Sequence, residues 1–516
     1  MACFQMSSFV KRVLVQRERE GMFMKYGSVS VWSMAFCLSA SFFFSAPAWS
    51  QPASTNRDTS SKTSAEEFRN VLRGFSGNRI EAHMVAATIS GGGRLGFPNR
   101  VYGEMGTVAG GAGNEAFSTA SVGGGVGNIA SGIRSTIAGG ENNAATLDST
   151  SIGGGYGNLA AGSHATVAGG ISNEATEIDA TVSGGSGNKA SERHSTIAGG
   201  SVNKASGLAA TIAGGFYNVA SATYSTAGGG IANVSSGMES TVSGGAGNHA
   251  SGESAFIGGG MNNHVTGPYS IVGGGRANVA GNDASGQCAY ATVGGGMGNK
   301  VSGSYSVVPG GSQNHAAGDY GFAAGSRARI EPGHDGVFLY SDHKDFEFPS
   351  AGPNEFAVRA TGGVRFVTGI DASGHSLAGV KVSPGSGSWE TLSDHRLKTS
   401  FSSVDGQEIL ERLKSVPIMS WRYRAEDSGV RHIGPTAQDF HKAFQFGADE
   451  RYISSVDTDG IALAAIQSLY EMVRERDKTI EAHENRIREM EANLAAQTRL
   501  MAELEARLQS AKSVTK

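Results

Sequence analysis

The chain has 516 residues, which is enough for more than one domain. Its 42 basic and 46 acidic residues give a net charge of −4 without a basic patch, which argues against nucleic-acid binding. Of its three cysteines, Cys3 and Cys37 lie in a predicted targeting segment, so Cys288 would remain alone and no internal disulfide is expected. The 77 glycines are about twice the usual share of roughly 7%. Such a glycine content is compatible with a folded structure, rather than disorder, only if the glycines recur periodically.

The first residues have the pattern of a secretory signal peptide, which we place at 1–50. Lys25 supplies a positive end, residues 31–46 an apolar core, and residues 48–50 (AWS) a small-x-small cleavage site before Gln51. The apolar run is shorter than the ~20 residues that span a bilayer, which argues against a transmembrane anchor. An uncleaved signal anchor fits the same residues and stays an alternative.

The residues on either side of this core have simpler interpretations. Met22 or Met24 would be the true start, because the preceding residues have no folding pattern. Residues 51–87 are polar and rich in serine and threonine at first, which predicts a linker. Within them, Glu66 to Gly74 could form one short helix.

A glycine-rich array at 88–318 repeats a unit close to S-T-I-A-G-G-x-x-N-x-A-S-G-x-x, with Thr88 to Asn99 as a degenerate leading copy. Most steps are 15 residues long, and one step carries an insertion that contains Cys288. The asparagine of the unit recurs at Asn114, Asn128, Asn143, Asn158, Asn173, Asn188, Asn203, Asn218, Asn233, Asn248, Asn263, Asn278, Asn299 and Asn314.

A period this short predicts a β-solenoid whose coils hold two short strands and two bends. The T-V/I-A-G-G segment suits a strand, the paired glycines allow tight bends, and asparagine tolerates a left-handed corner. Each coil contributes only one or two medium apolar side chains, such as Val108, Ile137 and Ile152. Because this core is thin, we expect the coils to pack against other chains.

The array resembles the head repeats of trimeric autotransporter adhesins. The resemblance implies a left-handed parallel β-roll shared among three chains, with a host surface or a carbohydrate as the expected ligand. Those adhesins end in a membrane-anchoring β-barrel segment, whereas this chain ends in a charged helical pattern. No membrane-spanning barrel is therefore expected.

The region 319–388 has more aromatic residues and predicts a small β domain, which we expect to be trimeric too. Its strand candidates, set between turn residues, are Val337–Tyr340, Phe346–Phe348, Phe356–Val358 and Val364–Val367. The tetrapeptide Asp342 to Asp345 could suggest a metal site, but no further ligand cluster accompanies it. A solvated turn is the preferred interpretation, and neither a metal nor a cofactor is expected.

The stretch Ser393 to Lys398 (SDHRLK) holds the best candidates for a catalytic pair. Serine is a poor nucleophile until a base removes its proton, and a lysine can do so where burial favours its neutral form. A turn would bring the two side chains together. The spacing also fits a purely structural alternative, in which Ser393 caps a helix with Asp394 in the first turn.

The surrounding segments resemble the S74 peptidase family, the intramolecular chaperone domain of phage endosialidases and tail spikes. The resemblance runs from about Trp389 to Tyr470, and we place the domain at 389–465. The segments that carry it are Trp389–Lys398, Ile409–Leu413, Pro417–Tyr423, Arg431–Asp439 and Asp457–Leu463. The family's catalytic serine and lysine fall on Ser393 and Lys398, and its R-H-x-G-x-x-A-Q stretch falls on Arg431–Gln438. Pro435-Thr436 departs from a place that is more often apolar in the family.

This resemblance implies a domain that trimerises, guides the fibre ahead of it into register and then cuts itself free. Ser393 would attack an adjacent carbonyl, with Lys398 as general base. Attack on the Leu392 carbonyl passes through a five-membered ring and attack on its own carbonyl through a strained four-membered one, and which adjacent bond breaks stays open. His395, His432 and Gln438 are possible supporting residues, although both histidines also fit structural roles.

The C-terminal segment 466–512 predicts a coiled coil of about six heptads. One apolar position recurs every seven residues, at Ile466, Val473, Ile480, Ile487, Leu494, Met501 and Leu508. The neighbouring seam is mixed, with Leu469, Arg476, His483, Met490, Gln497 and Leu504. The number of strands in the coil does not follow from these residues.

The chain is therefore predicted to be mainly β: a β-solenoid, a small β domain, an α+β chaperone and autoprotease, and a coiled coil. The leading hypothesis is a homotrimeric, adhesin-like fibre, secreted or held on the surface of a Gram-negative-type bacterium and matured by autoproteolysis. A prophage-derived tail fibre with the same chaperone is an alternative, against which the signal peptide argues. A carbohydrate-binding or carbohydrate-active fibre is another, although no acidic pair with a glycosidase context is apparent.

Overall fold

The computed structural model describes residues 69–281 and 288–514. The predicted signal peptide at 1–50 lies outside the described residues. Residues 71–72, inside the short helix predicted at Glu66–Gly74, form the strand β1 (Val71–Leu72) instead. The reason is tertiary: β1 pairs in parallel with β3 (Thr88–Ile89), so strand pairing overrides the local helix pattern.

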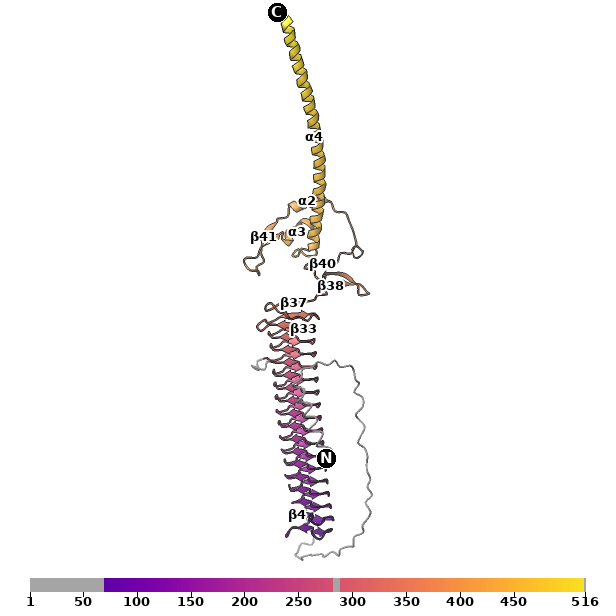
Figure 1. Ribbon diagram of the computed structural model, residues 1–516, viewed down its shortest axis with the longest axis vertical. Helices are drawn as coiled ribbons and strands as arrows, with labels where there is room; N and C mark the ends of the chain where they lie inside the picture. Colours follow the sequence, from indigo (N-terminus) through magenta and orange to yellow (C-terminus); the bar gives the residue numbers. More distant parts are fainter. Residues whose placement is uncertain (1–68, 282–287, 515–516) are drawn as a thin grey trace, which may run out of the picture. The chain divides into compact units, whose positions relative to one another are not determined.

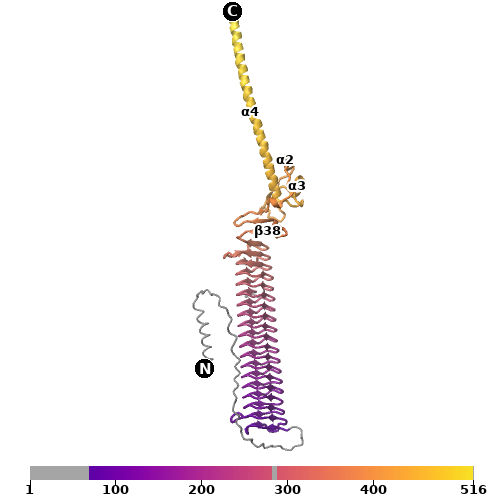
Figure 2. The same ribbon diagram turned by 90° about the vertical axis from the view of Figure 1, so that its right-hand side faces the viewer.

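Residues 71–359 form a β-solenoid (Figure 1). The period predicted this fold for 88–318, and the structure extends it at both ends, into the predicted linker at 51–87 and beyond residue 318. The odd-numbered strands, from β1 to β37 (Phe356–Arg359), make one ladder of 19 strands, and each coil supplies one of them. The even-numbered strands, from β2 (Arg79–Ile80) to β36 (Phe348–Pro349), make the second ladder. Most strands are two residues long, and Figure 2 shows them stacked coil upon coil.

The two ladders enclose a narrow core of β-branched residues facing alanines. In the strand β17 (Thr196–Ile197), Ile197 is completely buried while Thr196 is half-buried on the outer side. In β18 (Lys204–Ala205), Ala205 is buried and Lys204 is exposed. The pairing steps from Thr181 to Thr196 to Thr211, so identical residues stack in register along the ladder.

The recurring asparagines form a buried hydrogen-bonded column along the solenoid. Asn143 shows the pattern: its backbone N–H donates to Asn128 Oδ1 (3.1 Å), and its Nδ2 donates to the carbonyls of Gly139 (3.1 Å) and Gly155 (3.0 Å). Its own Oδ1 accepts from the backbone N–H of Asn158 (2.9 Å). Each asparagine therefore ties three consecutive coils together.

Replacing Asn143 with alanine should destabilise the solenoid. The change removes the hydrogen-bond partners of the Gly139 carbonyl and of the Asn158 N–H, at about 1–3 kcal/mol for each group left unpaired. The Gly155 carbonyl loses one of its two bonds and keeps the one from the Glu141 N–H. Thermal unfolding followed by circular dichroism should show a clearly lowered midpoint. The control is the neighbouring, exposed Asn142 with φ 55, where glycine is readily accommodated; Asn142→Gly should leave the midpoint nearly unchanged. Equal midpoints for the two variants would contradict the role of the column.

Close stacking explains the second glycine of each pair. Gly140 has φ 94, and a Cβ at this position would collide with the carbonyl of Gly155 in the next coil. Both the left-handed conformation and the close approach therefore exclude larger residues here.

The solenoid continues into the region predicted as a separate β domain. The strands β33 (Phe322–Gly325), β35 (Phe338–Ser341) and β37 pair in parallel and extend the first ladder beyond the glycine-rich repeats. Between them, β34 (Ala328–Ile330) extends the second ladder. The expected strands are present at 338–341 and 356–359, but they form further coils of the solenoid.

Asp342 belongs to the tetrapeptide that could suggest a metal site, and its hydrogen-bond partners are residues near the end of the solenoid. Its carboxylate accepts hydrogen bonds from the hydroxyl and backbone N–H of Thr361 (2.6 and 2.8 Å) and from Arg359 Nε (3.0 Å). These hydrogen bonds, those from Thr361 foremost, lower the pKa of Asp342. Asp342 therefore ties the last coil together.

A three-stranded antiparallel sheet follows the solenoid in the chain. It consists of β38 (Val364–Ile370), β39 (Ser376–Val382) and β40 (Glu390–Thr391), with β39 in the centre. The serine- and glycine-rich residues 383–388 connect β39 to β40.

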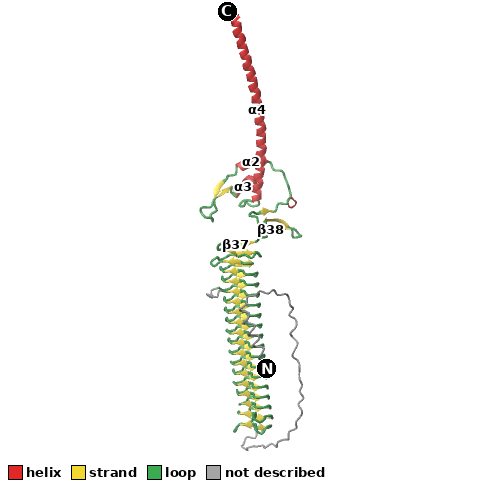
Figure 3. Cartoon of the chain, viewed as in Figure 1, coloured by secondary structure: helices red, strands yellow, loops and turns green. Residues whose placement is uncertain are grey.

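The C-terminal module contains the helices α2 (Gly406–Lys414), α3 (Ala437–Phe444) and the start of α4 (Ser455–Val514). A strand pair accompanies them, formed by β41 (Met419–Trp421) and β42 (His432–Gly434) (Figure 3).

The small core of this module comes from all three helices. It consists of Ile409, Val416, Phe440, Phe444, Ile461 and Ala465. Pro435-Thr436, which stands where the S74 family more often has apolar residues, is explained by the N-cap of α3. Thr436 is that cap, and its Oγ1 accepts a hydrogen bond from the Asp439 backbone N–H (3.2 Å). No helix in the described ranges has the length and apolar character that crossing a membrane requires.

Candidate functional site

The structure brings the predicted pair, Ser393 and Lys398, into direct contact. Ser393 follows β40, and the short 3-10 helix η1 (His395–Leu397) then turns the chain back. Backbone hydrogen bonds from Leu397 to Asp394 (3.1 Å) and from Lys398 to His395 (3.2 Å) close this turn. Lys398 Nζ consequently lies 2.6 Å from Ser393 Oγ and donates a hydrogen bond to it.

The N-cap of the turn is Asp394, not Ser393 as the structural alternative required. Asp394 Oδ1 accepts from the Arg396 backbone N–H (2.9 Å), and its other oxygen forms an ion pair with the Arg396 guanidinium (2.6 Å). The Arg396 hydrogen bonds lower the pKa of Asp394 to about 2, so its carboxylate is charged at neutral pH. With the cap supplied by Asp394, the Ser393 hydroxyl faces Lys398.

This arrangement has the elements of an activated nucleophile: a hydroxyl in hydrogen-bond contact with an amine that can take its proton. Both side chains are exposed in the single chain. A lysine acts as a base only in its neutral form, which desolvation favours. The structure therefore supplies the contact between the amine and the hydroxyl, whereas the single chain does not bury either side chain.

The possible supporting residues lie elsewhere. His395 stacks on Phe401, with ring centroids 4.5 Å apart. His432 contacts Trp421 and hydrogen-bonds Glu426 (2.9 Å), while Gln438 is exposed on α3. Within residues 69–281 and 288–514, no hydrogen bond joins any of the three to Ser393 or Lys398. Both histidines therefore have partners of their own away from the pair.

The residues directly before Ser393 belong to the antiparallel sheet. The Leu392 backbone N–H donates to the Gly379 carbonyl (3.1 Å), and Lys381 pairs with Glu390 (3.0 Å). The sequence did not single out Gly379 or Lys381. The alternating residues of β39 were the signal from which this strand could have been predicted. Its pairing with β40 could not, because β40 is only two residues long and follows a loop.

Comparison with known protein families places this site in a defined context. Residues 393–446 match the family Peptidase_S74, described as chaperone of endosialidase. The matched segment begins at Ser393 and includes Lys398, both histidines and Gln438. A comparison of the chain with curated proteins finds no match.

Proposed function

Because this chain carries an S74 chaperone-of-endosialidase domain behind a β-solenoid, we propose that it is the subunit of a homotrimeric, adhesin-like fibre whose C-terminal module assembles the trimer and then cuts itself free. The single observation that carries the self-cleavage is the 2.6 Å contact between Lys398 Nζ and Ser393 Oγ at the start of the matched domain. In this proposal Ser393 is the nucleophile and Lys398 the general base.

The proposed reaction cleaves the bond between Leu392 and Ser393. Ser393 Oγ forms a bond to the Leu392 carbonyl carbon while its proton passes to the neutral Nζ of Lys398. The C–N bond then breaks, and the freed Ser393 amine takes the proton from Lys398. Water hydrolyses the resulting ester, which leaves a Leu392 carboxylate and restores the Ser393 hydroxyl.

The exposure of the pair couples this reaction to assembly. Contacts between chains would cover the two side chains, and a covered lysine is more readily neutral. Cleavage would then follow trimerisation rather than precede it. Once the module has left, the assembled fibre has no route back to free chains, which makes it kinetically stable.

Mass measurement of the purified wild-type chain tests the proposal. Two pieces that meet next to Ser393 would support it. A folded trimer whose chains all remain intact would contradict it.

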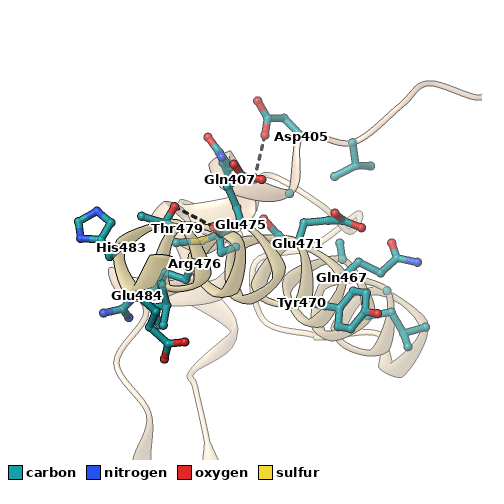
Figure 4. Close-up of a pocket in the computed structure, with 18 of the residues that line it drawn as sticks. Asp405, Gln407, Gln467, Tyr470, Glu471, Glu475, Arg476, Thr479, His483 and Glu484 are labelled. Atoms are coloured by element: carbon teal, nitrogen blue, oxygen red, sulfur yellow. Dashed lines mark hydrogen bonds between the residues drawn. The ribbon is translucent and has the colours of Figure 1, made fainter. Parts of the chain in front are cut away.

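Trimerisation is supported by the unpartnered surface of α4. Its recurring apolar positions, from Ile466 to Leu508, are exposed in the single chain. An open groove runs along α4 beside the start of α2, and both predicted seams line it, with Ile480 and Ile487 from one and Arg476 and His483 from the other. Figure 4 shows Arg476 and His483 on α4, in the same groove as Asp405 and Gln407. A parallel coiled coil of three copies would fill this groove.

Two charges placed in the apolar seam should separate the chains. In Ile480→Asp with Ile487→Asp, two apolar side chains that face the groove become carboxylates, whose burial between helices is costly. Light scattering on the full chain should show a shift from trimer to monomer. The matched control is Asn485→Asp with Ala492→Asp, which adds the same charge away from both seams and should stay trimeric. A trimer in both variants would rule out the coiled coil as the assembly element.

We also propose export of the fibre to the outside of the cell, on the basis of the signal-peptide pattern at 1–50. A prophage tail fibre with the same module is the alternative, and a ligand on a host surface or a carbohydrate fits either.

A further inference from the structure

The strand that ends at the proposed cleavage site is held in register by a sheet outside the S74 match. The register pairs Val380 with Thr391 and Lys381 with Glu390. One residue further, the Leu392 N–H donates to the Gly379 carbonyl at 3.1 Å. The residues on the N-terminal side of the proposed bond thus lie along β39 as a bound peptide strand does in strand-addition recognition.

Side chains reinforce this register on both sides of the strand. Lys381 Nζ lies 3.0 Å from Glu390, and hydrogen bonds from Ser383 and from Lys381 lower the pKa of Glu390. Trp389, directly before β40, contacts Phe366 of β38, with ring centroids 5.6 Å apart. A shallow pocket joins these elements: it is lined by β38, β39, Glu390 and Leu392, and it reaches Ser393.

We propose that β39 is the docking strand for the scissile segment, and that Gly379 and Lys381 are positioning residues that align the Leu392 carbonyl with Ser393 Oγ. The proposal rests on the proposed self-cleavage and adds a part of the fibre that precedes the chaperone domain. The physical reason is geometric, because nucleophilic attack needs the reacting atoms at about 3–3.5 Å with correct alignment. The bond at Leu392 N–H fixes the peptide unit next to the one that is cut.

The proposal also states what happens to the new chain end. After cleavage, Glu390, Thr391 and Leu392 remain paired with β39, so the new C-terminal carboxylate stays attached to a folded sheet. The fibre therefore ends in an ordered strand, while the released module begins with Ser393.

The first test is Gly379→Ala in the full chain. A Cβ at Gly379 would collide with the Phe366 carbonyl of β38, so β39 must move and carry its own carbonyl away from Leu392. The chain is refolded by dilution from denaturant, and the cut fraction of the trimer is followed on a denaturing gel. We expect cleavage to slow about tenfold or more. The matched control is Gly369→Ala in β38, where the new Cβ would lie at an ordinary 3.5 Å from Ala378 Cβ and cleavage should keep the wild-type rate.

The second test exchanges the charges that align the two strands. Lys381→Glu and Glu390→Lys each place like charges opposite one another, and each should slow cleavage about two- to fivefold, as suits an exposed pair. The double variant restores attraction and should recover the wild-type rate, and so should Lys381→Arg. Rates are compared among chains already in the trimer, so that a change in assembly does not appear as a change in cleavage.

The outcomes separate this inference from the proposed function. If the wild-type chain does not cut itself, the proposed function fails. If the wild-type chain cuts itself, and Gly379→Ala and the single charge variants cut as fast as the wild-type chain and Gly369→Ala, then β39 does not position the strand. That result would overturn this inference. If Gly379→Ala does not assemble, the charge-exchange series alone decides.

Discussion

Ser393→Ala should leave every chain at full length, whereas the wild-type chain should yield a C-terminal fragment that spans residues 393–516. Alanine removes the only oxygen that lies in contact with Lys398 Nζ in this turn, so no ester can form at Leu392. Lys398→Met should have the same outcome, because methionine keeps much of the side-chain length and lacks the amine. A denaturing gel and the intact mass of each purified chain measure the result.

Two exposed residues outside the pair serve as controls for these variants. Ser388→Ala removes a hydroxyl just ahead of the same strand, and Lys414→Met removes an exposed amine at the end of α2. Both variants should cut as the wild-type chain does. A fragment of unchanged mass from Ser393→Ala would show that another residue is the nucleophile, or that a separate protease makes the cut.

Removal of the C-terminal module, residues 393–516, should leave the solenoid unable to assemble into a soluble trimer. One corner of the coils exposes large apolar side chains, namely Tyr156, Ile171, Phe216, Ile231 and Met261. Ser186, Ser201 and Ala246 interrupt this row, so the apolar side chains lie in short groups along the corner. Exposed apolar groups of this kind favour uncontrolled association when nothing aligns the chains. Light scattering and sedimentation of the chain 1–392 should therefore show aggregates or monomers.

The physical reason lies in the order in which contacts form. Most strands of the ladders are two residues long, and their similar repeats would allow chains to associate one or more coils out of step. In the proposed function, a trimeric module at the end of the chain would raise the local concentration of neighbouring chains and align them from one end. The control is the full-length Ser393→Ala chain, which keeps the module and should be a soluble trimer. A soluble trimer from the chain 1–392 expressed by itself would remove the chaperone role.

Much of this organisation followed from local patterns. The repeat predicted the solenoid because the Val/Ile and Asn positions keep their phase, and those residues are the buried ones, as Ile197 and Asn143 illustrate. The spacing of Ser393 and Lys398 allowed a turn to join them as well as a serine cap, and the structure has such a turn in η1. Their catalytic role stays a proposal.

Other features left no such local pattern. Ser393-Asp394 allows a serine cap by its sequence, yet Asp394 is the cap, because its carboxylate binds both the backbone N–H and the guanidinium of Arg396. Likewise, the region 319–388 lacks the glycine and asparagine period, so its sequence predicts a separate domain, although β33 to β37 continue the ladder.

By itself, the sequence determined the period of the solenoid, its buried columns and the five-residue spacing of Ser393 and Lys398. Each of these depends on residues that are close to one another in the sequence. Only the tertiary structure decided where the solenoid ends and that Gly379 meets Leu392. Both depend on backbone hydrogen bonds between strands, which any residue with a free N–H or carbonyl can make and which therefore leave little trace in residue identity.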